Sequence, residues 1–286
     1  MTDMATEFAV RRWKDVSVIL ETTTGKIGLG LSVAFLTLAL FAPWLTPYPP
    51  SAIVGPAYAP PSAVHILGTD DIGEDILSQL ILASRGSVLV AVAAGSISTI
   101  LGVTVGLFAG YYGGRFGEIL MRLTDIMLVL PLLPLLIVVA AYVPPSITVI
   151  VSVIGILSWP ITARTIYSQT LTLKARPMVD LCKLSGMSDL EVMFTVLLPN
   201  QISLAIASGV FAAVSAVVIE SGLDFIGLGS IRNLSWGIML YFALSRNALL
   251  RGAWQWFLPP GVMIALLGSG LILVGYGIER AAKIRD

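Results

Sequence analysis

The sequence predicts an all-α polytopic membrane protein with six transmembrane helices, and three observations support this class. Of its 286 residues, 56% are hydrophobic and only 12% are charged, whereas a soluble domain typically carries about 25% charged residues. Six apolar stretches approach the length of about 20 residues that a helix needs to cross a bilayer. The basic residues fall mostly on one side of these stretches, as in membrane proteins with a fixed orientation.

The six stretches divide the chain. A cytoplasmic lead-in at 1–26 precedes the first span at 27–45, and an external segment at 46–86 follows it. The other five spans form a core at 87–280, and residues 281–286 make a cytoplasmic tail. Only Pro144 and Pro145 separate the third span from the fourth, so these two spans form a tight hairpin. The spans run over residues 27–45, 87–109, 119–143, 146–166, 202–222 and 257–278.

The basic residues orient the spans. Most of the 17 Lys and Arg residues lie in the lead-in, in the loop after the second span, in the segment behind the fourth span and in the tail. Cytoplasmic loops carry an excess of Lys and Arg, so we expect both termini in the cytoplasm together with the segment behind the fourth span. The basic residues left on the external side are Arg85, Arg232, Arg246 and Arg251.

The composition excludes several functional classes. The net charge is zero and no basic stripe occurs, which argues against a nucleic-acid partner. The single histidine, His65, excludes a two-histidine zinc motif and a Ser–His or Cys–His catalytic set, and the single cysteine, Cys182, excludes an internal disulfide. No G-x-x-x-x-G-K-[S/T] loop is present, so the chain does not hydrolyse ATP by itself. We expect no catalytic site, bound cofactor or metal in this chain.

The external segment changes character along its length. It opens rich in proline and then turns acidic, with Asp70, Asp71, Glu74 and Asp75 close together. From Ile72 onward the apolar residues recur at helical spacing, which predicts a short helix at the membrane interface. Asp71 is the expected N-cap of this helix, with Glu74 in the capping-box position.

The segment behind the fourth span, residues 170–200, carries two helix patterns separated by a break. Gly186 supplies the break, because glycine accepts a left-handed conformation at little cost. Ser188 and Glu191 have the spacing of a capping box that opens a second helix, and Pro199 is expected to stop that helix. The apolar face of the first helix consists of Val179, Leu181, Cys182 and Leu184, and that of the second of Leu190, Met193, Phe194, Val196 and Leu197.

Two interpretations of these apolar faces stay open. A bent pair of short helices with an exposed apolar side normally meets a partner protein. Alternatively, the same side packs against the spans of this chain. The pattern alone does not decide between a docking surface and ordinary internal packing.

Charged residues and prolines inside the third span give further candidates. Arg122 and Asp125 lie three positions apart, so we expect them to pair with each other, because intramembrane charges usually pair or face the bundle. A contact between Asp125 and a substrate is the alternative. Pro131 can kink the same span, which serves either as part of a gate or as an ordinary feature of membrane helices.

Glu220 and Asp224 lie one turn apart near the external end of the fifth span. The simpler interpretation is that both reach the aqueous rim and stay solvated. The alternative is that Asp224 faces the pore, where two carboxylates would favour a cationic or amine-bearing cargo.

Several of these segments together resemble one family. Residues 180–182 (Asp-Leu-Cys), with Gly186 and Pro199 at matching distances, are similar to the EAA loop of ABC-importer permeases. Asp stands in place of the usual Glu, and Leu-Cys in place of Ala-Ala. Segments 65–73, 109–114 and 225–237 resemble, in this order, the signatures of the dipeptide-permease C type among the peptide and nickel permeases. The resemblance covers about residues 27–280 of the chain.

This resemblance implies a permease subunit of a binding-protein-dependent ABC importer in the cell membrane, with residues 87–280 as its permease core. The implied partners are a second permease subunit, two ABC ATPase subunits that hold ATP and Mg²⁺, and an external substrate-binding protein. The loop around Gly186 would dock on an ATPase subunit. The cargo stays open among peptides, oligosaccharides and nickel.

An ATP-independent secondary transporter or channel is the alternative function. Such a protein would show inverted repeats or paired intramembrane acids in corresponding spans, and the sequence has neither pattern.

Overall fold

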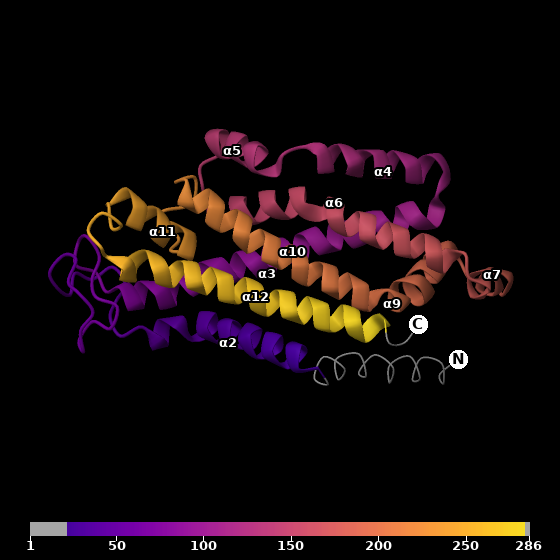
Figure 1. The fold of residues 1–286 in the computed structure, drawn as a ribbon. Coiled ribbons are helices and arrows are strands. Elements are labelled where there is room, and N and C mark those ends of the chain that lie inside the picture. Colours follow the sequence, from indigo (N-terminus) through magenta and orange to yellow (C-terminus); the bar gives the residue numbers. More distant parts are fainter. Residues whose placement is uncertain (1–21, 284–286) are drawn as a thin grey trace.

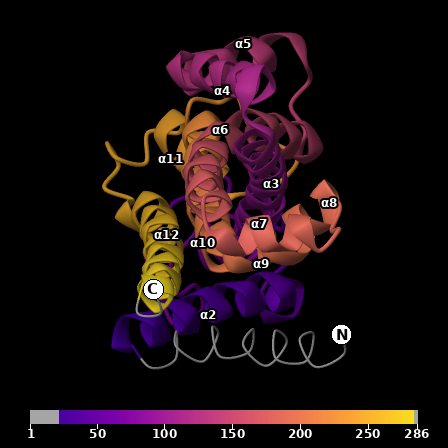
Figure 2. The ribbon, with the colours of Figure 1, turned by 90° about the vertical axis from the view of Figure 1, so that its right-hand side faces the viewer.

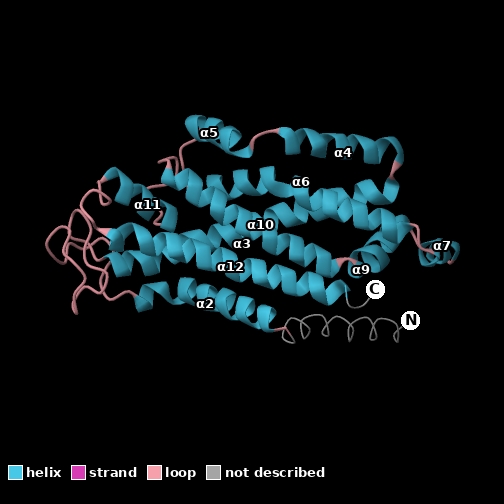
Figure 3. Ribbon diagram, viewed as in Figure 1, coloured by secondary structure: helices cyan, strands magenta, loops and turns pink. Residues whose placement is uncertain are grey.

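The computed structural model describes residues 22–283, and this part of the chain is mostly helical, with two isolated β-bridges and no strand. Most of the predicted lead-in at 1–26 and half of the predicted tail at 281–286 lie outside the described residues. In chain order the helices are α2 (Thr23–Leu45), α3 (Ile76–Tyr112), α4 (Gly114–Val129), α5 (Leu132–Tyr142), α6 (Ile147–Lys174), α7 (Pro177–Leu184), α8 (Asp189–Glu191), the π-helical turn η1 (Val192–Leu197), α9 (Leu198–Asn200), α10 (Ile202–Phe225), α11 (Trp236–Ser245) and α12 (Trp254–Lys283) (Figures 1 and 3).

Five helices are long and apolar enough to cross a membrane, and a bent pair adds a sixth candidate. The five are α2, α3, α6, α10 and α12, and the bent pair consists of α4 and α5, which meet at an angle of 82°. The expected class of an all-α membrane protein is therefore confirmed. Residues 22–283 therefore contain five candidate spans, or six if the bent pair is counted as one span.

The third predicted span, 119–143, is not one continuous helix. α4 ends at Val129 and α5 begins at Leu132, and both residues between them have extended backbone. Pro131 causes this break, because proline has no N–H to continue the hydrogen-bond ladder and pushes Leu130 out of the helical region. The chain turns sharply here, where the sequence predicted only a kink.

The second predicted span and the predicted interfacial helix form one helix. α3 has 37 residues, which at 1.5 Å per residue is about 55 Å and exceeds a hydrocarbon core of about 30 Å. Its N-cap is Asp75, whose carboxylate accepts a hydrogen bond from the backbone N–H of Ser78 at 2.8 Å. The predicted cap at Asp71 is therefore wrong. Asp70 organises the preceding turn, because its carboxylate accepts from two backbone N–H groups that follow it.

α3 is the central helix, and α2, α6, α10 and α11 pack around it (Figures 1 and 2). Glycines bring α3 close to α6. A Cβ at Gly106 would lie 2.5 Å from the carbonyl oxygen of Ala163, and a Cβ at Gly102 would lie 2.5 Å from the Cβ of Thr162. Neither position has room for a side chain, and small residues are the usual means of close helix packing in membranes.

α11 is a short helix fastened to α3. Trp236, fully buried at its start, donates from the indole N–H to the carbonyl of Leu80 at 3.1 Å. The ring of Trp236 also packs edge-on against the ring of Phe35, with 5.7 Å between the centroids. Ser235 caps α11, because its hydroxyl oxygen accepts from the backbone N–H of Ile238 at 3.1 Å. These contacts hold α11 against the bundle beside the end of α10.

The bundle has two different ends. The loop of residues 46–75 and α11 lie at one end, and α7, α9 and the last turns of α12 lie at the other (Figure 1). α3 reaches from one end to the other (Figure 3).

Gly106→Ala is expected to lower the free energy of unfolding by about 1–3 kcal/mol, because the added methyl group overpacks the contact between α3 and α6. The measurement is the thermal unfolding midpoint of the purified protein in detergent. Gly30→Ala is the matched control, because a Cβ at Gly30 meets nothing within 4 Å, and it should be neutral or slightly stabilising. Equal midpoints for the two variants would contradict the close packing.

Candidate functional site

The segment between α6 and α10, residues 175–201, projects from one end of the bundle (Figure 1); we call it the projection. α7 begins with Pro177 in its first turn, where the missing N–H breaks no helical bond. After α7 the chain turns at Gly186, whose φ of +85° is left-handed. The backbone N–H groups of Gly186 and Met187 donate back to the carbonyls of Lys183 and Cys182. The predicted glycine stop is confirmed.

Ser188 and Glu191 form the predicted capping box. The hydroxyl oxygen of Ser188 accepts from the backbone N–H of Glu191 at 3.3 Å, and the carboxylate of Glu191 accepts from the backbone N–H of Ser188 at 2.7 Å. The backbone N–H of Ser188, and then its hydroxyl, hold the pKa of Glu191 below its ordinary value, because both stabilise the ionised carboxylate. The capping box fixes the start of the second helix, because it gives hydrogen-bond partners to backbone N–H groups that have none within the helix.

The second helix does not stop at Pro199 as predicted. It continues through η1 and α9 to Asn200, and the break comes at Gln201, with a φ of −122°. Pro199 lies in the first turn of α9. The π-helical turn before it shifts the carbonyl groups with which a proline ring would collide in a regular α-helix.

The apolar side chains of the projection divide into two groups. One group is buried against the ends of α3 and α6, so the packing interpretation is right for these residues. The other group is exposed and available to a partner. The buried residues are Val179, Val192, Met193 and Leu197, and the exposed residues are Leu181, Leu184, Leu190 and Phe194.

Neither group includes Val196, which is half-buried, or the predicted residues Asp180 and Cys182. Asp180 is exposed in the first turn of α7, where a carboxylate is favoured by the helix dipole. Cys182 is half-buried and is a free thiol.

Tyr111, at the end of α3, ties the projection to the bundle. Its hydroxyl donates to Asp189 Oδ1, and its backbone carbonyl accepts from Lys174 Nζ. Lys183 Nζ lies 4.9 Å from the centroid of the Tyr111 ring and 4.0 Å from Asp189 Oδ1. Sequence reasoning missed this role, because Tyr111 and Asp189 are 78 residues apart and no local pattern joins them.

Asp125 does not pair with Arg122 as predicted. Its carboxylate accepts from the guanidinium of Arg164 in α6, and both side chains are about half exposed. The prediction was wrong because α6 runs beside α4 and brings a guanidinium to the carboxylate from the facing helix. Arg122 makes no ion pair among residues 22–283.

The bend at Pro131 leaves an open cavity of about 320 Å³ between the α4–α5 pair and the helices α6 and α10. Its walls are mostly apolar, and its single carboxylate belongs to Glu279. Neither Asp125 nor Pro131 is among the residues that line it. The apolar residues that face each other across it include Leu128, Leu132 and Leu135 on one side and Phe211 and Ile219 on the other.

Glu220 and Asp224 do not reach an aqueous rim. Each is 2% exposed, because α11 and the loop before it pack over this end of α10. The Ser235 hydroxyl donates to Asp224, and the Ser221 hydroxyl donates to Glu220 at 3.3 Å. The solvated-rim interpretation is wrong, and a direct contact with cargo would require both side chains to leave this burial.

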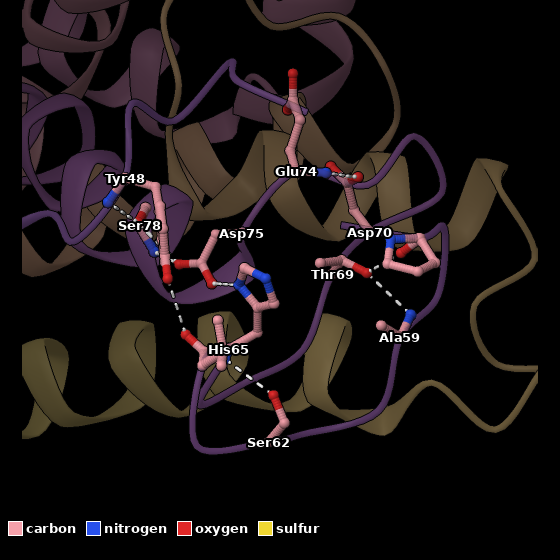
Figure 4. Close-up of polar contacts among 11 residues, drawn as sticks. Tyr48, Ala59, Ser62, His65, Thr69, Asp70, Glu74, Asp75 and Ser78 are labelled. Carbon is pink, nitrogen blue, oxygen red and sulfur yellow. Dashed lines mark hydrogen bonds and ion pairs between the residues drawn. The ribbon is translucent and has the colours of Figure 1, made fainter. Parts of the chain in front are cut away.

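The loop of residues 46–75 holds a polar network around the start of α3 (Figure 4). His65 is buried, and its Nδ1 lies 3.0 Å from Asp75 Oδ1. Ser78 donates its hydroxyl to Asp75 and accepts from the backbone N–H of Tyr48 at 3.1 Å. His65 therefore supports the N-cap of α3. Within residues 22–283, no group of three or more His, Cys, Asp or Glu side chains is placed to hold a metal ion.

Glu74 lies beside Asp70 in the same network. Burial and then the charge of Asp70 raise the pKa of Glu74 above its ordinary value. Gln79 donates its amide to both carboxylates at 2.7 Å, which partly offsets their repulsion. Asp70 and Glu74, together with Gln79, form the hydrogen-bonded turn that precedes α3.

Comparison with known proteins places these features in one family. Residues 102–283 match the family described as binding-protein-dependent transport system inner membrane component. The chain is 34% identical to the oligopeptide transport system permease protein OppC of Lactococcus lactis subsp. cremoris (strain SK11) over 230 residues, which are 80% of this chain and 78% of that protein. It is 36% identical to the di/tripeptide transport system permease protein DppC of Pseudomonas aeruginosa (strain UCBPP-PA14) over 262 residues, 89% of this chain and 86% of that protein. It is 31% identical to the dipeptide transport system permease protein DppC of Alkalihalophilus pseudofirmus over 281 residues, 96% of this chain and 90% of that protein.

Tyr111→Phe is expected to loosen the projection without unfolding the bundle. The variant keeps the buried ring and removes the hydrogen bond to Asp189, which is worth about 1 kcal/mol for a partly exposed partner. Hydrogen–deuterium exchange should become faster at 186–191 and stay unchanged in α10. Tyr112→Phe is the matched control, because Tyr112 is exposed and its hydroxyl makes no hydrogen bond to the projection. Unchanged exchange in Tyr111→Phe would mean that the ring packing alone holds the projection.

Proposed function

The chain belongs to the family of inner membrane components of binding-protein-dependent transport systems, and we propose that it forms one half of a peptide-conducting pore in an ATP-driven importer. It is a multi-pass permease of the cell membrane. The relatives named above, which match most of its length, are permeases of oligopeptide and dipeptide transport systems, so peptides are the proposed cargo.

The observation that carries the coupling part of this proposal is the exposed apolar group on the projection. An apolar patch that the chain leaves uncovered marks a protein contact. Leu184 is 84% exposed and Leu181 62%, and Leu190 and Phe194 are half-exposed. The polar capping box and the Tyr111 contacts hold these side chains on a fixed scaffold. We propose that an ABC ATPase subunit receives them in an apolar groove.

The projection is built to transmit movement to the bundle. Tyr111 joins it to α3, and Gln201 leads directly from α9 into α10. A displacement of the projection would therefore displace both helices. Two ATPase subunits that close on ATP and Mg²⁺ would move two such projections, and each permease bundle would rotate as a rigid body between inward-open and outward-open states.

The proposed assembly contains four further subunits. A second permease subunit completes the pore, two ATPase subunits bind and hydrolyse ATP with Mg²⁺, and an external binding protein delivers the cargo. This chain contributes the pathway and the contact with the ATPase, and no catalytic residue, cofactor, metal or nucleic-acid contact is assigned to it.

The proposed orientation puts the projection in the cytoplasm and the loop of residues 46–75 outside. Two facts support it. The basic residues in and behind α6, from Arg164 to Lys183, lie near the projection's end of the bundle, and cytoplasmic loops are rich in Lys and Arg. The start of α2 and the last turns of α12 lie toward the same end (Figure 1), which fits cytoplasmic termini.

Leu184→Asp and Leu190→Asp are expected to abolish most ATP-driven peptide uptake while leaving the permease inserted and folded. Each variant puts a charge into the proposed apolar contact, and an unpaired charge buried there costs on the order of 2–5 kcal/mol. The measurements are peptide uptake and copurification of the ATPase subunits with the tagged permease. Both should fall together.

Leu250→Asp is the control for this experiment. Leu250 is 87% exposed and lies between α11 and α12, at the end away from the projection. This variant should copurify with the ATPase subunits as the wild type does. Normal uptake and copurification in both Leu184→Asp and Leu190→Asp would show that the projection is not the docking surface. Uptake by the purified chain without any ATPase would instead favour an ATP-independent transporter.

Cysteine labelling tests the orientation. After Cys182→Ser removes the native thiol, engineered cysteines at Ala57 and Leu250 should react with a membrane-impermeant maleimide from outside the cell. Cysteines at Ser185 and Arg115 should react only after the membrane is opened. All four native side chains are exposed, so accessibility alone does not separate them. External labelling at Ser185 would overturn the orientation and the coupling proposal with it.

A further inference from the structure

Glu220 and Asp224 stand one helical turn apart in α10, and each is only 2% exposed. Both side chains line the same small cavity, so their carboxyl groups lie close to each other. Two adjacent carboxylates in a buried place repel each other, and both lose the hydration that an ionised group has in water. The pair therefore requires a balancing positive charge.

The pair lies where several elements meet. α10 contributes the two acids, α3 and α6 contribute apolar walls, and the loop before α11 contributes hydroxyl and amide groups. Together they line a small, partly open cavity of about 10 Å³, which is the room of about one water-sized sphere. The polar residues of the loop that line it are Ser230, Asn233 and Ser235, and the apolar walls include Val90, Ile147 and Ile150.

The two oxygens of Asp224 have different surroundings. Oδ2 accepts from the hydroxyl of Ser235, the N-cap residue of α11. Oδ1 is buried without a hydrogen-bond partner among the described residues. It lies against Gly229, where a Cβ would collide with it. A buried acceptor without a donor is costly, and a carboxyl group becomes a donor once it holds a proton.

No basic side chain of this chain's described residues reaches the pair. Neither α5, α10 nor α11 contains Lys or Arg, and those of α6 and α12 lie toward the other end of the bundle. α3 carries Arg85 and the loop before α11 carries Arg232, and both are exposed. The ion pairs found among residues 22–283 include neither acid. A single proton balances one of the two charges and turns one carboxyl group into a donor, and no group of three or more His, Cys, Asp or Glu side chains within residues 22–283 is placed to hold a metal ion.

We propose that Glu220 and Asp224 form a buried proton-binding site, in which the carboxyl group of Glu220 holds one proton and donates it in a hydrogen bond to Asp224. Asp224 is the ionised partner, because it faces the Ser235 hydroxyl and the first turn of α11, where a negative charge is favoured.

The site fastens α11 to α10 as long as the proton is present. Asp224 holds Ser235, and Ser235 caps α11. Loss of the proton leaves two adjacent buried charges, and their repulsion loosens this fastening. The site lies at the opposite end of the bundle from the projection (Figure 1), so its test does not require the proposed coupling contact to be correct.

Infrared difference spectroscopy on the full chain, purified with the subunits that accompany it, tests the shared proton. The spectrum of the wild type minus that of Glu220→Gln at neutral pH should contain the carbonyl band of a protonated carboxyl group, and the band should shift in D₂O. Glu118→Gln is the control, because Glu118 is exposed in α4 and its removal should change only carboxylate bands. Absence of the protonated band would overturn the proposal.

Asp224→Asn is the second variant, and it keeps the test valid if Glu220→Gln does not fold. It should move the protonated band, because Glu220 then donates to a neutral amide in place of a carboxylate. An unchanged band would mean that the two groups do not share the proton. Replacing choline with sodium at constant ionic strength should leave the band unchanged in the wild type, and a band that disappears with sodium would show a metal-cation site.

Thermal unfolding measured across a pH range is an independent test of the proposed link between the proton and the packing of α11. Above the ordinary pKa of a glutamate, about 4.3, the midpoint of the wild type should fall more steeply with rising pH than that of Glu220→Gln, because the folded wild type holds a proton that the unfolded chain has released. Equal slopes for the two proteins would overturn the proposed link between the proton and the packing of α11.

Discussion

The close contact between α3 and α6 is the constraint on which the other features depend. In a membrane, lipid chains are as apolar as the side chains, so helices associate by packing rather than by escape from water. Gly102 and Gly106 allow this packing, because the Thr162 side chain and the Ala163 carbonyl of α6 occupy the space where their side chains would be. The contact holds α3 as a fixed axis, to which Asp75 attaches the loop of residues 46–75 at one end and Tyr111 attaches the projection at the other.

Charged side chains in this bundle mostly have nearby partners that offset the free-energy cost of removing them from water. Asp125 and Arg164 pair across two helices and stay half exposed. Asp75 is buried, and it accepts hydrogen bonds from Ser78 and faces His65. Glu220 and Asp224 are the exception, since no basic side chain within residues 22–283 pairs with them, and the proposed shared proton accounts for their burial without a counter-ion. Buried polar groups in membranes are rare and usually functional.

The projection combines a rigid attachment with an uncovered surface. Its buried side chains and its capping box fix the positions of both short helices, so the exposed leucines and Phe194 do not contribute to holding the fold together. A surface of this kind can move as one body with the bundle. The proposed coupling needs this property, because movement of a partner subunit can reorient the pore only if the projection is held to the bundle, and the hydrogen bond between Tyr111 and Asp189 is one of the contacts that hold it.

The sequence determined those features that depend on residues close together in the chain. Helix class follows from apolar composition and length, the bend at Gly186 follows from glycine's left-handed backbone, and the box of Ser188 and Glu191 follows from a spacing of three residues. Proline was less informative, because α2, α6 and α12 contain prolines without a break whereas Pro131 ends one helix and starts another. Only the tertiary structure decided that Asp125 meets Arg164, that Tyr111 meets Asp189 and that α11 buries Glu220 and Asp224. Each of these contacts depends on which helices lie side by side. The periodic pattern of one helix shows which of its faces is apolar, but it does not show which other helix packs against that face.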